Sequence, residues 1–157
     1  MIGVGTLTAP LAIVAATVPQ APTALTRDDA NTSKTQVAFT WSAPTDNGGV
    51  AVIDYSISWD QGTSTYVSLA TGVTLSTYLK TGLLAGTTYK FKVSARNSIG
   101  TGSLSSEFSI VAATIPSTPA APITTYDGLT DTVSIDFESP TDDGGLTVNG
   151  YVIKIQR

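Results

Sequence analysis

The sequence contains no cysteine and no histidine among its 157 residues. Without cysteine the chain cannot form a disulfide, use a thiol nucleophile or bind a metal through thiolates. Without histidine it lacks the usual general base near neutral pH and the commonest metal ligand, so a Ser-His-Asp triad is excluded. The lack of disulfides assigns no compartment, because a domain of about a hundred residues can fold on its core alone.

Charged side chains are also scarce. They make up 13% of the chain, compared with about 25% in an average soluble domain. The formal net charge of −4 arises beyond residue 115, because the acidic and basic residues of segment 19–115 balance. A chain without a basic stripe offers no electrostatic footprint for nucleic acid or an anionic membrane. The nearly neutral central segment does little to oppose self-association.

The apolar segment Leu7–Ala16 follows Met1 and superficially resembles a secretory signal. No basic residue precedes Arg27, however, and similar text recurs within the chain as Leu104–Ala113. A segment that recurs inside a folded repeat is expected to be a strand and not a leader. It is also too short to cross a bilayer, so we expect no membrane span.

What the sequence does contain is an internal repeat. Ile2–Pro22 resembles Ile99–Pro119 at an offset of 97 residues, and Pro44–Gly49 recurs as Pro140–Gly145 at an offset of 96. Nearly equal offsets define a unit of about a hundred residues, the size of one small domain. We predict the last strand of a preceding repeat (or an exchanged strand) in residues 1–18, a complete domain in 19–115, and the first three strands of a following repeat in 116–157.

Apolar and polar residues alternate with a period of two, and no segment keeps a helical pattern. Val37, Phe39 and Trp41 share one face of a strand, and residues 88–96 alternate in the same way. Such strands bury one face and expose the other. Seven short strands in the central segment, the last of them a single strand over Leu104–Ala113, predict an all-β sandwich of two sheets. The proline-rich segments between repeats predict short, semi-rigid spacers.

The central segment resembles fibronectin type III domains. It carries Trp41 and Pro44, the turn 46–49, and then Tyr55, Leu83 and Tyr89 in the order and spacing of that family's core motif, over residues 19–115. The resemblance implies an immunoglobulin-like β-sandwich, repeated in tandem, with Trp41, Tyr55, Leu83 and Tyr89 as core signature residues. It also implies that the Tyr89 hydroxyl bonds back to nearby backbone as a tyrosine corner.

Two positions depart from the family's pattern. Ala85 stands where proline is usual, and we expect this to loosen the turn. Phe137 stands where the central segment has Trp41, and we expect it still to fill a core position.

Three groups of residues invite a functional interpretation. The turns 46–49 and 142–145 offer oxygens to calcium, but they lack the spacing and the distant bidentate Glu of a dedicated loop, so ordinary turn chemistry is preferred. Trp41 and Trp59 alternate with core residues, which favours packing over a carbohydrate platform. No pair of carboxylates stands out for glycosidic chemistry. We therefore predict no catalytic residue, no metal site and no cofactor.

Asn31, Thr32 and Ser33 form the only N-glycosylation sequon. If the chain follows a eukaryotic secretory route, a glycan on Asn31 is one interpretation. An unmodified polar loop is the other.

The incomplete repeats leave two explanations open. In the first, the sequence is a window on a longer tandem array. In the second, an apolar assembly strand with Leu7, Leu11, Ile13 and Val14 is added in trans to the open sheet of the next chain. That contact is heterologous, so it would propagate into a head-to-tail filament. One strand added to three still leaves the family's fourth to sixth strands missing, so a filament needs further contacts.

The functional expectation is a non-enzymatic structural protein of an extracellular or cell-surface fibre. Its expected partners are further copies of the chain or adjacent repeats, with glycans if Asn31 is modified, and no nucleic acid. The alternative is a spacer or adhesion module of a larger secreted enzyme or surface receptor. An intracellular scaffold of the muscle-giant type is a third interpretation, since the fold alone assigns no function.

Overall fold

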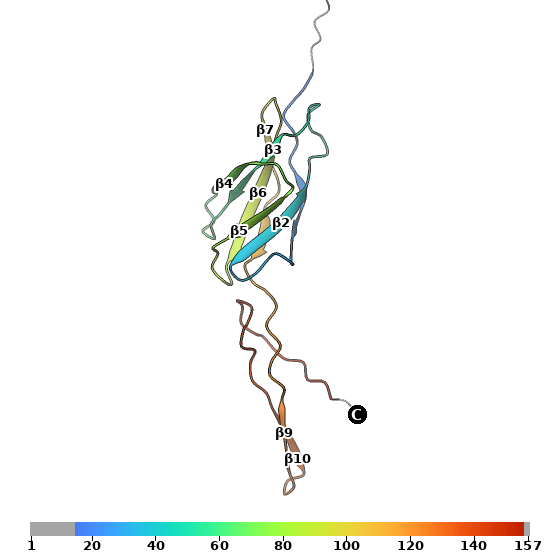
Figure 1. Ribbon diagram of the computed structural model, residues 1–157, viewed down its shortest axis with the longest axis vertical. Coiled ribbons are helices and arrows are strands. Elements are labelled where there is room, and N and C mark those ends of the chain that lie inside the picture. The colour runs from blue at the N-terminus through green and yellow to red at the C-terminus, as the bar shows by residue number, and fades with distance from the viewer. Residues whose placement is uncertain (1–14, 156–157) are drawn as a thin grey trace, which may run out of the picture.

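The computed structural model describes residues 15–155. Every regular element in that range is a β-strand, and the all-β prediction is confirmed. The strands are β1 (Thr23–Arg27), β2 (Gln36–Ser42), β3 (Asp54–Trp59), β4 (Val67–Val73), β5 (Thr77–Thr81), β6 (Thr88–Arg96), β7 (Thr101–Leu104), β8 (Phe108–Val111), β9 (Ile123–Asp127) and β10 (Thr132–Asp136). The first eight form the central domain, and the last two extend beyond it along the long axis of the molecule (Figure 1).

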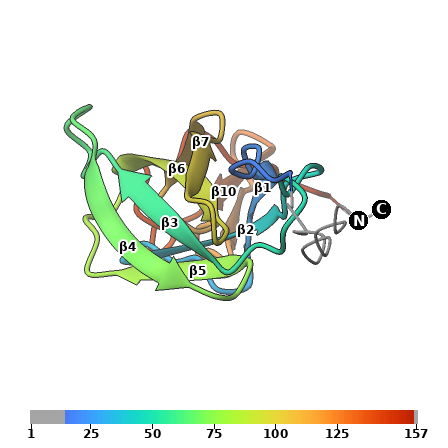
Figure 2. The ribbon, with the colours of Figure 1, turned by 90° about the horizontal axis from the view of Figure 1, so that it is seen from above.

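The central domain is a sandwich of two antiparallel sheets. One sheet has the order β1-β2-β5, and the other has the order β4-β3-β6-β7, with β8 also paired to β6. Viewed from above, β6 and β7 lie on the opposite side of the domain from β2 and β5 (Figure 2). This is the immunoglobulin-like arrangement that the sequence predicts.

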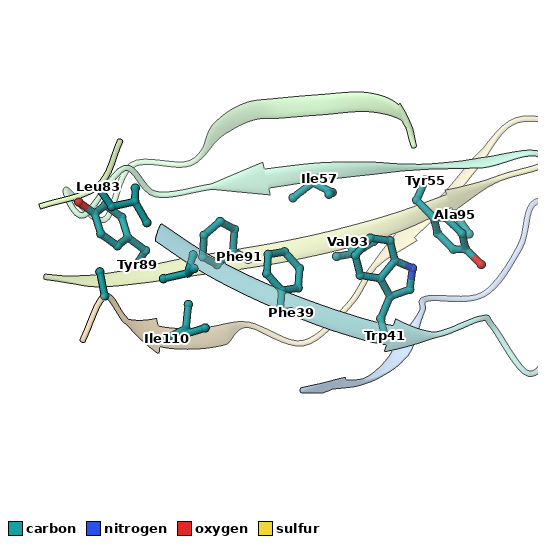
Figure 3. Close-up of a cluster of buried hydrophobic side chains, with 12 residues drawn as sticks. Phe39, Trp41, Tyr55, Ile57, Leu83, Tyr89, Phe91, Val93, Ala95 and Ile110 are labelled. Atoms are coloured by element: carbon teal, nitrogen blue, oxygen red, sulfur yellow. The ribbon is translucent and has the colours of Figure 1, made fainter. Parts of the chain in front are cut away.

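The core lies between the sheets and is built mainly by alternating residues of β2 and β6 (Figure 3). Val37, Phe39 and Trp41 are buried on β2. The buried residues of β6 include Tyr89, Phe91, Val93 and Ala95. The rings of Phe39 and Phe91 join the two sheets, with 4.7 Å between their centroids. The alternating apolar residues of β2 and β6 therefore point into the space between the sheets and form one apolar layer.

The structure corrects the prediction of a single strand over Leu104–Ala113, because that segment is divided between β7 and β8. Ser105 lies at the break and is buried. Its backbone N–H donates to the Val93 carbonyl at 2.7 Å, and its hydroxyl accepts from the Val93 N–H at 3.0 Å. A side chain therefore takes the place of one backbone partner, which interrupts the ladder between two stretches that both pair with β6. The central domain has eight strands where seven were expected.

Beyond the central domain, β9 and β10 form an antiparallel hairpin that pairs Ile123 with Asp136 and Asp127 with Thr132. A third strand was expected near the end of the chain, but the described residues 151–155 are in no strand. In the central domain the corresponding strand, β3, lies between β4 and β6. No such neighbours are present for the third strand within residues 15–155, so it has no ladder to join. Phe137 and Tyr151 consequently remain 43% and 40% exposed.

Candidate functional site

The two copies of the Pro-Thr-Asp-Asx-Gly-Gly sequence form the same turn. Oδ1 of Asp46 accepts the Gly48 N–H at 2.8 Å, and Oδ1 of Asp142 accepts the Gly144 N–H at 2.9 Å. Gly48 and Gly144 have φ of 75° and 74°, a left-handed conformation that favours glycine. The recurrence at an offset of 96 residues therefore encodes one backbone shape, closed by the aspartate side chain.

Each turn holds the linker that precedes its own repeat. The Thr17 N–H donates to the Gly48 carbonyl at 2.8 Å, and the Gln20 N–H donates to the Asp46 carbonyl at 2.9 Å. In the following repeat, the N–H groups of Thr114 and Ser117 donate to the carbonyls of Gly144 and Asp142 at 2.9 and 2.8 Å. We call each pair of hydrogen bonds a linker clamp. Its repetition explains why the linker and the turn recur together in the sequence.

The linkers also leave no room for side chains at three glycines. A Cβ atom on Gly48 would lie 2.1 Å from the Thr17 carbonyl oxygen, and one on Gly144 would lie 2.2 Å from that of Thr114. A Cβ on Gly102 would lie 1.9 Å from the Pro19 carbonyl oxygen. The linkers therefore pack directly against backbone, and any larger residue would force the two segments apart.

Asn97 completes the first clamp and was not singled out as a site in the sequence. Its side chain is buried, with 2% of the residue exposed. Nδ2 donates to the carbonyls of Thr17 at 2.7 Å and Asn47 at 2.9 Å. Oδ1 accepts the N–H groups of Ile99 at 2.9 Å and Gly100 at 3.1 Å. One amide thus ties the linker, the first turn and the loop after β6 together.

The second clamp also contacts the end of the central domain that faces the hairpin of β9 and β10. We call the surface formed there by Lys34, Ala85 and Gly86 the base. Nζ of Lys34 lies 2.7 Å from Oδ2 of Asp142. The hydrogen bond from Lys34 holds the pKa of Asp142 below its usual value and raises the pKa of Lys34. Both side chains are 45% exposed, so the pair contributes orientation more than stability.

The rest of this contact is backbone packing between two glycines. A Cβ atom on Gly86 would lie 2.6 Å from the Gly145 carbonyl oxygen. A Cβ on Gly145 would lie 3.2 Å from Cβ of Lys34 and 3.3 Å from Cβ of Ala85. Ala85, the departure from the family's proline, therefore lies at the contact with the following repeat. No sequence signal identified this, because the contacting segments are far apart in the chain.

The Tyr89 side chain positions the loop that carries this base. Tyr89 is 4% exposed, and its hydroxyl accepts the Leu84 N–H at 3.0 Å. This is the geometry of a tyrosine corner. It fixes the backbone one residue before Ala85.

We predict that Tyr89→Phe lowers the free energy of unfolding by about 1 kcal/mol, because the Leu84 N–H loses its partner. Chemical denaturation monitored by tryptophan fluorescence measures this change. Tyr78→Phe is the matched control, since Tyr78 also packs against the core cluster and its hydroxyl takes part in none of the side-chain hydrogen bonds formed within residues 15–155. Equal losses in the two variants would contradict a specific role for the corner.

The other predicted residues have clear positions. Trp41, Tyr55, Leu83 and Tyr89 are all buried in the core cluster. Trp41 packs edge-on against Tyr55 with ring centroids 5.3 Å apart. Trp59 stacks on Tyr89 at 5.8 Å, and Nζ of Lys80 lies 4.9 Å from the Trp59 ring centroid. Neither indole forms an open platform for a sugar. The assembly-strand residues Leu7, Leu11, Ile13 and Val14 lie outside the described residues.

The Asn31 sequon lies in the loop between β1 and β2. Asn31 is exposed, and its Nδ2 donates to Oδ2 of Asp28 at 2.8 Å. Thr32 is buried instead, and its hydroxyl donates to the Asp28 carbonyl at 2.7 Å and accepts the Ala38 N–H at 3.0 Å. Thr32, the middle residue of the sequon, thus has a structural role in closing the loop over β2.

Two further observations bear on chemistry. Over the described part of the chain, no group of three or more acidic side chains is placed to hold a metal ion. No helix there is long and apolar enough to cross a membrane. The acidic turn oxygens at Asp46 and Asp142 are already used as acceptors within their own turns.

Comparison with known proteins identifies relatives of the chain. Exoglucanase B of Cellulomonas fimi is 30% identical over 141 residues, which cover 86% of this chain and 12% of that protein. Fibronectin type-III domain-containing protein 3A of Homo sapiens is 29% identical over 132 residues, which cover 81% and 11% respectively. The chain therefore spans only a small part of the length of these relatives.

Solved structures share the fold at low sequence identity. A crystal structure of titin domains has a TM-score of 0.55 at 23% identity, over 62% of this chain and 33% of that one. A solution structure of a human FNIII domain has a TM-score of 0.56 at 18% identity, over 76% and 95%. At these identities the likeness concerns the fold alone.

The model of the fibronectin type III domain matches residues 20–111. That match covers more than half of the chain and coincides with the eight-strand sandwich. The chain therefore belongs to the fibronectin type III domain family.

Proposed function

We propose that the chain is a non-enzymatic structural part of an extracellular or cell-surface fibre, in which fibronectin type III repeats follow one another in line. The observation that carries this proposal is the linker clamp, which is present at both linkers. A module that only had to fold would not require each linker to be hydrogen-bonded to the repeat that follows it.

The clamp makes the linker part of the domain. Pro116, Pro119 and Pro122 restrict the backbone between the repeats. The hydrogen bonds of Thr114 and Ser117 then fix its path against the second turn. A linker held in this way transmits orientation from one repeat to the next, unlike a glycine- and serine-rich linker, which behaves as a flexible coil.

The surface of the central domain supports the same proposal. Its balanced charge does little to keep copies apart. Four of its six basic side chains, Arg27, Lys34, Lys90 and Arg96, are paired with carboxylates, which reduces the charge that could attract an ionic ligand. The proposed partners are adjacent repeats or further copies of the chain, with a glycan on Asn31 if the chain is secreted from a eukaryotic cell.

Immunogold electron microscopy of the source cells tests this function. An antibody raised against the purified chain should label fibres outside the cell or at its surface. Label confined to the cell interior, or to dispersed particles in the medium, would contradict a fibre role. A denaturing gel developed with the same antibody reports the size of the native polypeptide.

The alternative function is a spacer in a larger secreted enzyme. The alignment of 86% of the chain with part of Exoglucanase B favours it. Under this alternative the antibody should deplete a hydrolytic activity from the culture medium and should label no fibres. The two functions therefore give opposite results in the same preparation.

A further inference from the structure

The two turns differ in how well they are covered, although their internal hydrogen bonds are the same. Gly48 and Gly144 are both buried by their linkers. Asp142 and Gly145 are half-buried, whereas the corresponding residues Asp46 and Gly49 are exposed. The base of the central domain covers the second turn. Within residues 15–155 no equivalent base covers the first turn.

The residues that meet the base have counterparts of the same chemistry in the first turn. Asp142, which pairs with Lys34, corresponds to Asp46, and Gly145 corresponds to Gly49. Leu146, whose Cδ2 lies 3.6 Å from where a Cβ on Gly86 would be, corresponds to the apolar Val50. Unlike the other two pairs, Leu146 is 49% exposed and Val50 is half-buried, so the carboxylate and the glycine mark the difference in coverage. A carboxylate, a glycine and an apolar side chain therefore recur in the same order on the same backbone shape.

We infer that Asp46, Gly49 and Val50 form a docking surface for the base of a preceding repeat that carries a lysine where Lys34 lies and a glycine where Gly86 lies. This inference rests on the proposed in-line array and names the contact that joins its members. The occupant is a further copy of a repeat like the central one, because that base already binds the same pattern at the second turn.

The docking surface distinguishes between repeats. Lys34 corresponds to Thr130 at the offset of 96 residues and to Asp131 at the offset of 97, and neither is basic. A base of that kind offers no cation to Asp46. The surface therefore fits a central-type repeat better than a repeat like the one that begins at residue 116.

A chain with the central repeat duplicated tests the inference. In this designed chain, residue 113 of the first copy is joined to residue 17 of a second copy that continues to residue 157. Thr17 of the second copy then takes the place of Thr114 at the added junction. Because the natural chain has no cysteine, spin labels can be attached through Ser109→Cys, at an exposed position of β8. Labels in both copies report on the added junction. Labels at Ser109→Cys of the second copy and Ser134→Cys on β10 report on the natural junction.

Pulsed electron spin resonance should give a narrow distance distribution across both junctions. Asp46→Asn in the second copy should widen the distribution across the added junction about twofold, because the amide keeps an Oδ1 for the Gly48 N–H but no longer carries the charge that pairs with the lysine of the base. Lys34→Gln in the first copy should widen the distribution to the same extent, and the two changes together should widen it no further. Thr71→Lys in the second copy is the control, since it adds a cation at an exposed position of β4 and should change neither junction.

The possible failures are distinguishable. A broad distribution at the added junction, with a narrow one at the natural junction, overturns the docking surface but leaves the in-line arrangement intact. Broad distributions at both junctions overturn the docking surface and remove the support for the proposed function. A narrow added junction that does not respond to Asp46→Asn overturns the assignment of this contact to Asp46.

Discussion

Phe39→Ala is expected to lower the free energy of unfolding of the central domain by about 3–5 kcal/mol, the cost typical of removing a buried aromatic side chain. Phe39 is fully buried at the middle of β2. Its ring packs against Phe91 at 4.7 Å and against Trp41 at 5.7 Å between centroids. Truncation therefore leaves a cavity at the point where the two sheets meet. The linker clamps should fail with it, because they depend on loops that the sheets position.

Chemical denaturation measures this loss, and Leu79→Ala on the neighbouring strand β5 is its control. Leu79 is 48% exposed, so its truncation should change the free energy of unfolding by no more than about 0.5 kcal/mol. If Phe39→Ala costs no more than Leu79→Ala, the core assigned between β2 and β6 is wrong.

The core was predictable because its signal is local. In a strand, residues two apart share a face, so Val37, Phe39 and Trp41 could be placed together from their spacing. The same argument applied to residues 52–59 groups Ile53 with Tyr55 and Ile57, and for Ile53 it is wrong. Strand β3 begins at Asp54, and Ile53 is 50% exposed at the end of the sandwich. The alternation of apolar residues shows which side chains share a face of a strand. It does not show where the opposite sheet ends and leaves that face exposed.

The junctions were only half predictable. The repeated turn and the repeated linker were visible as two separate matches, but nothing in the sequence stated that they touch. Asn97 lies 80 residues from Thr17, and Lys34 lies 108 residues from Asp142. Contacts at such separations depend on the folded sandwich, which brings the loop after β6 beside the first turn. The break between β7 and β8 was missed for a related reason, since Ser105 acts through Val93 on another strand.

The clamps explain why both the linker and the turn have nearly the same sequence in the two repeats. Linker residue and turn residue must fit as a pair, because Gly48 and Gly144 admit no side chain beside Thr17 and Thr114. A change in either member alone would disturb the junction. The hydrogen bonds of the linker therefore serve both the fold of each repeat and the proposed in-line array.

Asn97→Asp is the sharpest test of that coupling, with an expected loss of about 3 kcal/mol in the free energy of unfolding. The carboxylate can still accept the N–H groups of Ile99 and Gly100, but it cannot donate to the carbonyls of Thr17 and Asn47. The two carbonyls, whose bonds to Asn97 are part-buried, then lose this donor and face a negative charge. The Thr17 N–H should also exchange faster with solvent, because the linker beside it loses the Asn97 bond and keeps only the two backbone bonds of the clamp.

Ser98→Asp provides the matched control, since it adds the same charge at the next residue, which is exposed. Chemical denaturation and amide hydrogen exchange followed by NMR should separate the two variants. An equal loss of stability in both would mean that the charge, and not the missing donor, is responsible. If Asn97→Asp destabilises the domain without faster exchange at Thr17, then Asn97 supports only the loop after β6. In that case the linker is held by the turn, and orientation passes between repeats without the side chain of Asn97.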